Sequence, residues 1–92
     1  MTARELTTMT SSTEAQVIKI ARGQFDWTGE LTATTDLRRE LDLDSLHLVE
    51  LQVAVEDHFR VAFDPLDEQL VDAFRTVRTL AAYVDYLATK GR

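Results

Sequence analysis

The segment from Ser45 to Phe59 most constrains how this 92-residue chain can fold, because its apolar residues repeat with a helical period on two separate sides. At roughly 100° per residue, one set lies within an arc of about 80°, which is typical of a helix packed on a core. This core stripe consists of Leu48, Leu51, Val55 and Phe59. A second stripe, Leu46, Val49 and Val53, is bordered by acidic residues. A surface helix needs one apolar face, so the second stripe is either a binding surface or a face covered by the long preceding loop.

Two of the other helices follow from the same period. Val17, Ile18 and Ala21 recur at helical spacing, and Gly23 is the expected end of this first helix. Several N-cap candidates stand at 10–13. Thr76 is a suitable N-cap for the last helix, and Gly91 lies beyond its end. Its repeating apolar residues are Val77, Leu80, Ala81, Val84 and Leu87.

Between these helices the pattern is less regular. Pro65 breaks the helix that starts at Ser45, and residues 66–74 favour a short third helix. The stretch 24–44 reads as a long loop, which is uncommon unless its own side chains fix it to the core. Five large apolar residues are expected to do so: Phe25, Trp27, Leu31, Leu37 and Leu41. The sequence therefore predicts an all-α four-helix bundle with a long loop between the first two helices and no well-supported strand.

Length and composition limit the classes of protein to which this chain can belong. Residues 11–90 form one small domain after a flexible tail at 1–10, and the domain is too small for a deep catalytic cleft. No apolar run is long enough to span a bilayer, and the N-terminus lacks the apolar region of a secretory signal. We therefore expect a cytoplasmic monomer that does not bind membranes. Cysteine is absent, so any thiol chemistry must be supplied by an added group.

The net charge of −6 is unevenly distributed. Between Leu41 and Phe74 there are nine acidic residues and one basic residue, whereas the rest holds seven acidic and nine basic residues. An acidic segment repels nucleic acid and attracts basic protein surfaces. The charge distribution argues against nucleic-acid binding and is compatible with a basic protein partner, but taken alone it favours a merely solvated acidic face.

Ser45 follows Asp44 at the start of the predicted helix, and catalysis by this serine is excluded by what surrounds it. A nucleophilic serine needs a base within hydrogen-bonding reach. His47 projects from the opposite side of the helix, and His58 lies about three turns away. Asp44 is better suited to accept hydrogen bonds from helix-terminal N–H groups. We therefore assign no catalytic residue and do not expect an enzyme.

A metal site held by this chain alone is also not expected. An EF-hand loop counted from Asp42 would place His47 where glycine is required and Val53 where the bidentate glutamate belongs. A hydroxyl at a helix N-terminus is instead well placed to bear a phosphodiester, because free N–H groups and the helix dipole favour negative charge there. Asp42 and Asp44 can help a visiting enzyme to hold Mg²⁺ during such an attachment.

In these surroundings the chain closely resembles the acyl carrier proteins over about residues 13–88. The family signature, Asp-Ser-Leu at the start of the second helix, is present as Asp44-Ser45-Leu46. The other residues that carry the resemblance are Asp36-Leu37, Val49-Glu50-Leu51, Glu56-Asp57, Phe59, Thr76-Val77 and Tyr83-Val84-Asp85-Tyr86-Leu87.

The resemblance implies that Ser45 receives 4'-phosphopantetheine from coenzyme A through a Mg²⁺-dependent phosphopantetheinyl transferase. The terminal thiol of this arm then carries acyl groups as thioesters. The resemblance also implies docking of partner enzymes, such as acyltransferases and ketosynthases with basic surfaces. The positions implied for docking are Leu46, Val49, Glu50, Val53, Glu56 and Asp57.

Three departures from the family pattern distinguish this chain: Asp42 in place of the usual glycine, His47 where an acid is frequent, and Phe63-Asp64-Pro65 after the second helix. With the arginine-rich composition, they favour polyketide or other specialised biosynthesis over fatty acid biosynthesis. One alternative is a peptidyl or aryl carrier of nonribosomal synthesis. Another is an acidic helical interaction module in which Ser45 is only a helix cap.

Overall fold

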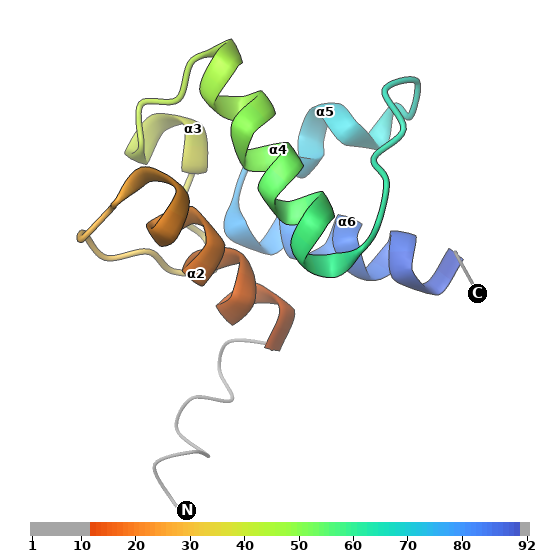
Figure 1. Cartoon of the computed structure of the whole chain (residues 1–92), viewed down its shortest axis with the longest axis horizontal. Helices are drawn as coiled ribbons and strands as arrows, with labels where there is room; N and C mark the ends of the chain where they lie inside the picture. The colour runs from red at the N-terminus through yellow and green to blue at the C-terminus, as the bar shows by residue number, and fades with distance from the viewer. Residues whose placement is uncertain (1–11, 91–92) are drawn as a thin grey trace, which may run out of the picture.

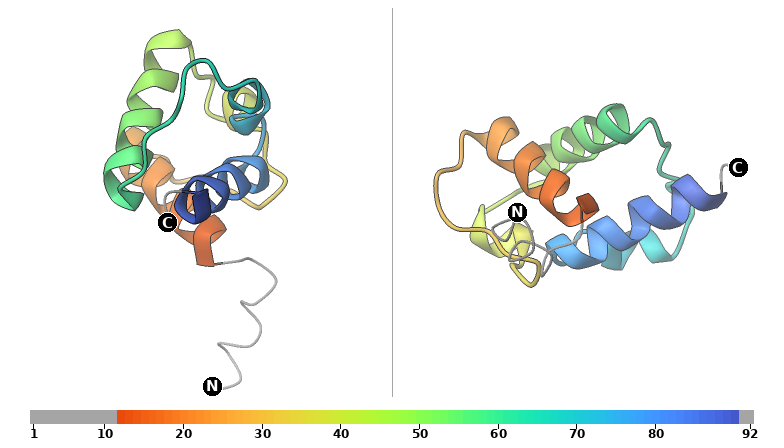
Figure 2. Two further views of the ribbon diagram at one scale, coloured as in Figure 1. Left: turned by 90° about the vertical axis from the view of Figure 1, so that its right-hand side faces the viewer. Right: turned by 90° about the horizontal axis from the view of Figure 1, so that it is seen from below.

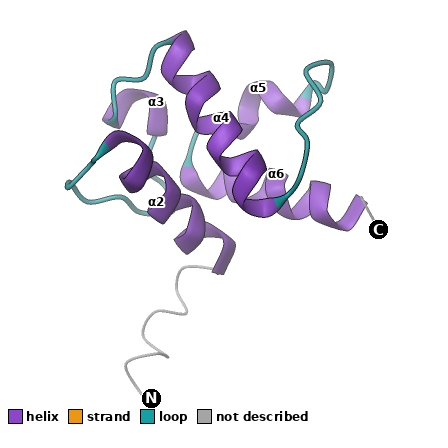
Figure 3. Cartoon of the chain, in the orientation of Figure 1, coloured by secondary structure: helices purple, strands orange, loops and turns teal. Residues whose placement is uncertain are grey.

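The computed structural model describes residues 12–90, so the predicted tail at 1–10, Ser11 and Gly91 lie outside the described residues. Within this range the chain is helical and contains no strand, only an isolated β-bridge between Asp36 and Thr76 (Figures 1 and 3). The helices are α2 (Ser12–Phe25), α3 (Leu37–Glu40), α4 (Ser45–Phe59), α5 (Gln69–Ala73) and α6 (Val77–Lys90). The predicted all-α fold with four helices is confirmed, and α3 is an additional single turn inside the predicted long loop.

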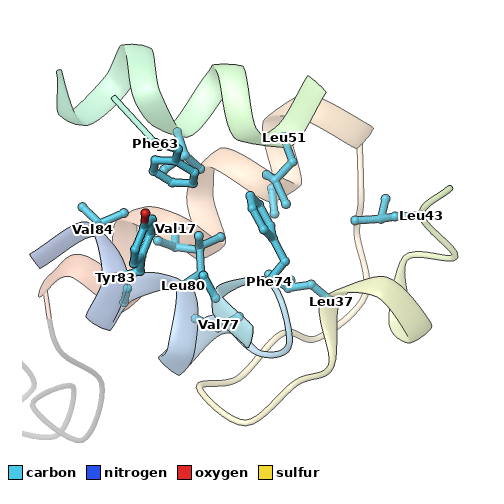
Figure 4. Close-up of a cluster of buried hydrophobic side chains, with 14 of the residues drawn as sticks. Val17, Leu37, Leu43, Leu51, Phe63, Phe74, Val77, Leu80, Tyr83 and Val84 are labelled. Atoms are coloured by element: carbon cyan, nitrogen blue, oxygen red, sulfur yellow. The ribbon is translucent and has the colours of Figure 1, made fainter. Parts of the chain in front are cut away.

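Three long helices enclose the core. α2 packs against both α4 and α6, and α5 packs against α6 (Figure 2). Figure 4 shows side chains from α2, α4 and α6 meeting in one cluster. Its fully buried members are Val17, Ala21, Leu37, Leu51, Val55, Val77 and Leu80. The predicted core stripe of α4 therefore faces this cluster through Leu51 and Val55.

The predicted end of the first helix at Gly23 is wrong. α2 continues for two more residues to Phe25, which packs partly buried against the core. Asp26 then adopts a left-handed conformation with a φ of 52°, and the Trp27 N–H donates to the Arg22 carbonyl over 3.0 Å. This is the hydrogen bond of a Schellman C-cap. A glycine inside a helix costs only about 1 kcal/mol relative to alanine, so core packing extends the helix past it.

The predicted anchors of the long loop are confirmed. Leu31 and Leu37 are buried, while Phe25, Trp27 and Leu41 are partly buried against the core. α3 forms in the middle of this segment because Asp36 caps it, with Oδ1 accepting from the Arg39 N–H over 3.1 Å. A helix of one turn has no repeating pattern, so hydrophobic periodicity does not reveal it.

α3 is fixed to the beginning of α6 by backbone hydrogen bonds. The Leu37 N–H donates to the Arg75 carbonyl over 3.3 Å, and the Val77 N–H donates to the Thr35 carbonyl over 3.2 Å. The Arg78 N–H donates to the Ala33 carbonyl over 2.8 Å. These bonds use N–H groups in the first turns of α3 and α6, which lack partners within their own helices.

The end of α4 at Phe59 agrees with the prediction, but Pro65 is not its cause. Arg60 adopts a left-handed conformation with a φ of 57°, and its N–H donates to the Glu56 carbonyl. The chain then turns back so that Phe63 is buried against Tyr83, with ring centroids 5.1 Å apart. The short third helix, α5, lies inside the predicted range 66–74.

We expect truncation of a side chain to lower stability much more in the core stripe of α4 than in its second stripe. Leu51 is fully buried, so Leu51→Ala should lower the free energy of unfolding by about 2–5 kcal/mol through lost packing and a residual cavity. Leu46 is 64% exposed, so Leu46→Ala should change it by less than about 0.5 kcal/mol. Urea unfolding followed by circular dichroism measures both values. Equal destabilisation by the two variants would contradict the assignment of the faces.

Candidate functional site

The loop that leads into α4 is held by α3. The Leu43 N–H donates to the Arg38 carbonyl over 2.9 Å, and the Asp42 N–H donates to the Arg39 carbonyl over 3.4 Å. Leu43 is buried, with 7% of its surface exposed, and joins the core cluster. These residues position Ser45. Our sequence reasoning missed the anchoring role of Leu43, although its place two residues before the serine was a usable signal.

Asp42 makes the turn in this loop. Its φ is 52°, in the left-handed region that glycine adopts without steric cost and that aspartate tolerates better than most residues. The aspartate thus takes the conformation that a glycine would favour at this position. Its side chain is exposed, so it adds a carboxylate three residues before Ser45.

Asp44 is the N-cap of α4, as predicted. Its Oδ1 accepts from the His47 N–H over 2.9 Å, and His47 Nδ1 lies 2.9 Å from the same oxygen. The hydrogen bond from the His47 N–H is the main cause that lowers the pKa of Asp44 below its ordinary value of 3.8. The proximity of the His47 ring lowers this pKa further. Asp44 is therefore a carboxylate at neutral pH and supplies a hydrogen-bond acceptor at the N-terminus of α4.

Ser45 is the first residue of α4 and is exposed. Within residues 12–90 its hydroxyl forms no hydrogen bond. The two histidines have other partners: His47 lies beside Asp44 and edge-on to the Phe25 ring, with centroids 5.8 Å apart, and His58 Nε2 lies 2.7 Å from Gln16 Oε1. The serine thus presents a free hydroxyl with no side-chain base beside it.

An exposed, unbonded hydroxyl at this position fits a covalently attached phosphodiester. α4 has 15 residues, so its N-terminus carries the partial positive charge of a full helix dipole. A phosphate on Ser45 Oγ would project into solvent and would not have to displace a packed side chain. The residues present therefore fit the arm that the sequence predicts.

The second stripe of α4 lies on the protein surface. Leu46, Val49 and Val53 are 64%, 54% and 48% exposed. The alternative that the preceding loop covers this stripe is therefore wrong. Val49 and Val53 line a shallow hollow of about 470 Å³ together with Glu50 and Asp57. The stripe with its two acidic residues forms a continuous exposed surface that starts one residue after Ser45.

Glu56, the remaining residue predicted to contact partners, has a structural contact as well. Its Oε2 accepts from the Phe63 N–H over 2.7 Å, which ties the end of α4 to the following loop. Glu56 is only half-exposed, unlike Glu50 and Asp57. The structure thus brings Leu46, Val49, Glu50, Val53 and Asp57 to one surface and places the Glu56 carboxylate against the chain itself.

No cluster of three or more potential metal ligands occurs among the described residues. Within residues 12–90, none of the helices combines the length and apolar character that a membrane-spanning helix needs. The exposed features near Ser45 include its hydroxyl, the Asp42 and Asp44 carboxylates, and the apolar stripe with its acidic border.

Comparison with known proteins adds to this geometry. A family model described as "Phosphopantetheine attachment site" matches residues 15–84. A curated relative, "Acyl carrier protein 3" from Ralstonia nicotianae, is 42% identical over 60 residues. The match covers 64% of this chain and 66% of the relative. No solved structure matches the chain significantly.

We expect removal of the Asp44 carboxylate, but not of the Ser45 hydroxyl, to destabilise α4. Asp44→Ala should lower the urea midpoint at pH 7, because the His47 N–H loses its acceptor, whereas Ser45→Ala should change stability by less than about 0.5 kcal/mol. The pKa of Asp44 is lowered on folding, so its contribution is present above the unfolded-state pKa and is lost as the pH falls through the folded-state pKa.

Urea titrations between pH 7 and pH 2.5 measure this dependence. The difference between wild type and Asp44→Ala should be constant near neutral pH and shrink below about pH 4. Asp44→Asn is the matched control, because asparagine caps helices well and does not titrate. A difference that is unchanged at the lowest pH would contradict the assigned role of the carboxylate.

Proposed function

The chain belongs to the acyl carrier proteins, the family with a phosphopantetheine attachment site, and on that premise we propose that Ser45 is the residue that bears the group. The cofactor of this family is covalently attached 4'-phosphopantetheine, whose terminal thiol holds acyl groups as thioesters. The observation that carries the assignment is the Ser45 hydroxyl, which is exposed, unbonded within residues 12–90 and located at the N-terminus of α4, next to the N-cap Asp44.

The residues around Ser45 support a carrier without catalytic activity of its own. Asp44 caps the helix terminus, and the His47 backbone N–H and Nδ1 both lie against this carboxylate, whereas no hydrogen bond joins His47 to the Ser45 hydroxyl among the described residues. A phosphopantetheinyl transferase would bring the base and Mg²⁺, with Asp42 and Asp44 as candidate outer ligands. We place this attachment in the cytoplasm, where coenzyme A is available.

The exposed stripe and its acidic border support docking of partner enzymes. Apolar residues at the centre of a small interface contribute most of the contact energy, and rim charges mainly set the rate and specificity of association. Leu46, Val49 and Val53 would form the centre, with Glu50 and Asp57 at the rim. The proposed partners are a transferase and acyltransferase- or ketosynthase-type enzymes with basic surfaces.

We further propose a polyketide or other specialised pathway ahead of fatty acid biosynthesis. Asp42 in the turn before Ser45 and His47 on α4 alter the charge that a partner meets near the attachment point. A partner adapted to this carrier would have to accommodate both. These two departures support the preference.

We expect Ser45 to be the site of modification. Incubation of the protein with coenzyme A, Mg²⁺ and a promiscuous phosphopantetheinyl transferase should add one phosphopantetheine to the intact mass, because the hydroxyl is accessible. Ser45→Ala should remain unmodified, while Ser12, another exposed serine of the described chain, serves as a matched control through Ser12→Ala. Absence of any addition to folded wild type would favour the interaction module. Addition that persists in Ser45→Ala would contradict the assigned residue.

We expect the acidic border of the stripe to speed association with the transferase. Glu50→Lys should lower kcat/KM for modification roughly tenfold at low salt, because it places a cation against a basic partner surface. The effect should shrink at about 1 M NaCl, where the Debye length is near 3 Å. Glu30→Lys, an equal charge change at an exposed loop residue away from α4, is the control. An equal loss in both variants would show that only net charge matters.

A further inference from the structure

Three arginines lie beside the loop that leads into Ser45. The backbone carbonyls of Arg38 and Arg39 accept hydrogen bonds from this loop, which fixes both residues next to it. Arg75 lines one hollow with these two arginines and with Asp42, which is three residues before the serine. All three arginine side chains are exposed. A flexible arm attached to Ser45 therefore begins next to three positive charges.

The charges around this loop do not by themselves require arginine. Three aspartates line the same hollow, Asp36, Asp42 and Asp72, so the formal charges of the lining balance. Lysine would balance them equally well. Arg38 and Arg39 form no ion pair with the described residues, so the paired donors of a guanidinium are not used there. The two kinds of cation still differ in chemical reactivity.

The two lysines of the sequence lie in other parts of the fold. Lys90 is in the last turn of α6, where its Nζ lies 5.7 Å from the centroid of the Tyr86 ring. It lines a hollow with the C-terminal end of α4, and the 15 residues of that helix place this end about 21 Å from Ser45. Figure 1 shows the end of α6 away from the beginning of α4. Lys19 is exposed on the outer side of α2, about 160° around the helix from the buried Val17.

The arm proposed on Ser45 would carry its cargo as a thioester, which reacts with free amines. Fourteen bonds join the serine oxygen to the sulfur, so the extended arm reaches about 15–17 Å, at roughly 3.3–3.6 Å for every three bonds. The unprotonated amine of a lysine within that radius would add to the acyl carbonyl. The new C–N bond forms as the C–S bond breaks, and the departing thiolate takes up the proton that the amine loses. The products are an amide on the protein and an arm without cargo.

Lysine and arginine differ sharply in this reaction. A lysine amine with the ordinary pKa of about 10.4 is unprotonated for about 0.4% of the time at pH 8. A flexible tether raises its effective concentration to the millimolar range, so even this small fraction would react over hours. A guanidinium, with a pKa above about 12, stays protonated and delocalised and has no electron pair free to attack.

We propose that the three arginines protect the thioester on Ser45, because they balance the neighbouring aspartates without offering an amine that can take the acyl group. The proposal rests on the function proposed above, since Ser45 must bear the arm. An acyl group that moves to a lysine is lost to partner enzymes, because an amide is far less reactive than a thioester. The two lysines of the chain stand on the outer side of α2 and beyond the far end of α4, away from this region.

The test introduces the amine and follows where the acyl group goes. A promiscuous transferase loads the whole chain from acetyl-coenzyme A, both as wild type and as the variant with Arg38→Lys, Arg39→Lys and Arg75→Lys. After incubation at about pH 8.5, hydroxylamine removes acetyl groups held as thioesters and leaves amides, which intact mass and peptide mapping detect. We expect amide to form in the variant roughly a hundredfold faster than in wild type. This is the ratio of a millimolar effective concentration to a protein concentration of about 10 µM.

Three comparisons separate transfer within one chain from general lysine reactivity. The rate in the variant should not depend on protein concentration. The same variant without the arm, mixed with free acetyl-coenzyme A at an equal concentration, should acetylate as slowly as wild type. Arg60→Lys is the matched control, because it adds an exposed lysine at the far end of α4 and should not increase transfer. The three single variants are loaded separately as well, and circular dichroism checks their folding.

Each other outcome overturns the proposal in a recognisable way. A loaded variant that forms amide no faster than wild type would show that lysine is tolerated beside the arm. Transfer to Lys19 or Lys90 in wild type, at a rate independent of concentration, would show that the arm reaches amines anyway. Failure of the transferase to load wild type would remove the proposed function and this protection with it, whereas loading without transfer in the variants would remove only the protection.

Discussion

The geometry around Ser45 depends on a short stretch of backbone pairing between two segments that are far apart in the sequence. Hydrogen bonds join residues 33–37 to residues 75–78 and fix α3 at the beginning of α6. Leu37, fully buried at this junction, adds its side chain to the core. From there the carbonyl groups of Arg38 and Arg39 hold the loop at 42–43, and Asp44 caps α4. Without this sequence of contacts, the loop before Ser45 would be a long unsupported connection whose ordering costs about 1–2 kcal/mol per residue in backbone entropy.

α4 contributes to stability with one face, and the proposed partner binding uses the other. Leu51 and Val55 are removed from water and contribute to folding at roughly 25 cal/mol for each Å² of apolar surface buried. The stripe that contains Val49 and Val53 stays exposed and gains none of this energy until a partner covers it. Surface substitutions on the second face should therefore affect association more than folding. This separation lets one helix present the proposed binding surface next to Ser45 without weakening the core.

The border of the second stripe and the cavity beside Ser45 differ in charge. The exposed side of α4 carries the acidic residues Glu50 and Asp57. The cavity between α3, α4 and α5 is lined by three arginines and three aspartates, so its formal charges balance. The acidic border of α4 is therefore the charged feature that supports the proposed basic partner.

The sequence by itself determined the helices that are long and periodic, since Ser45–Phe59 matches the predicted α4 and the loop anchors Leu31 and Leu37 are buried as expected. It also identified Asp44 as the cap and indicated Ser45 from the Asp-Ser-Leu signature. Only the tertiary structure decided the end of α2, the formation of α3 and the exposure of the second stripe. These features depend on contacts between distant segments: Phe25 packs against the core, and Leu37 pairs with Arg75. A local pattern indicates which residues prefer to be buried. How the helices pack decides which residues bury them, and it leaves Val49 exposed.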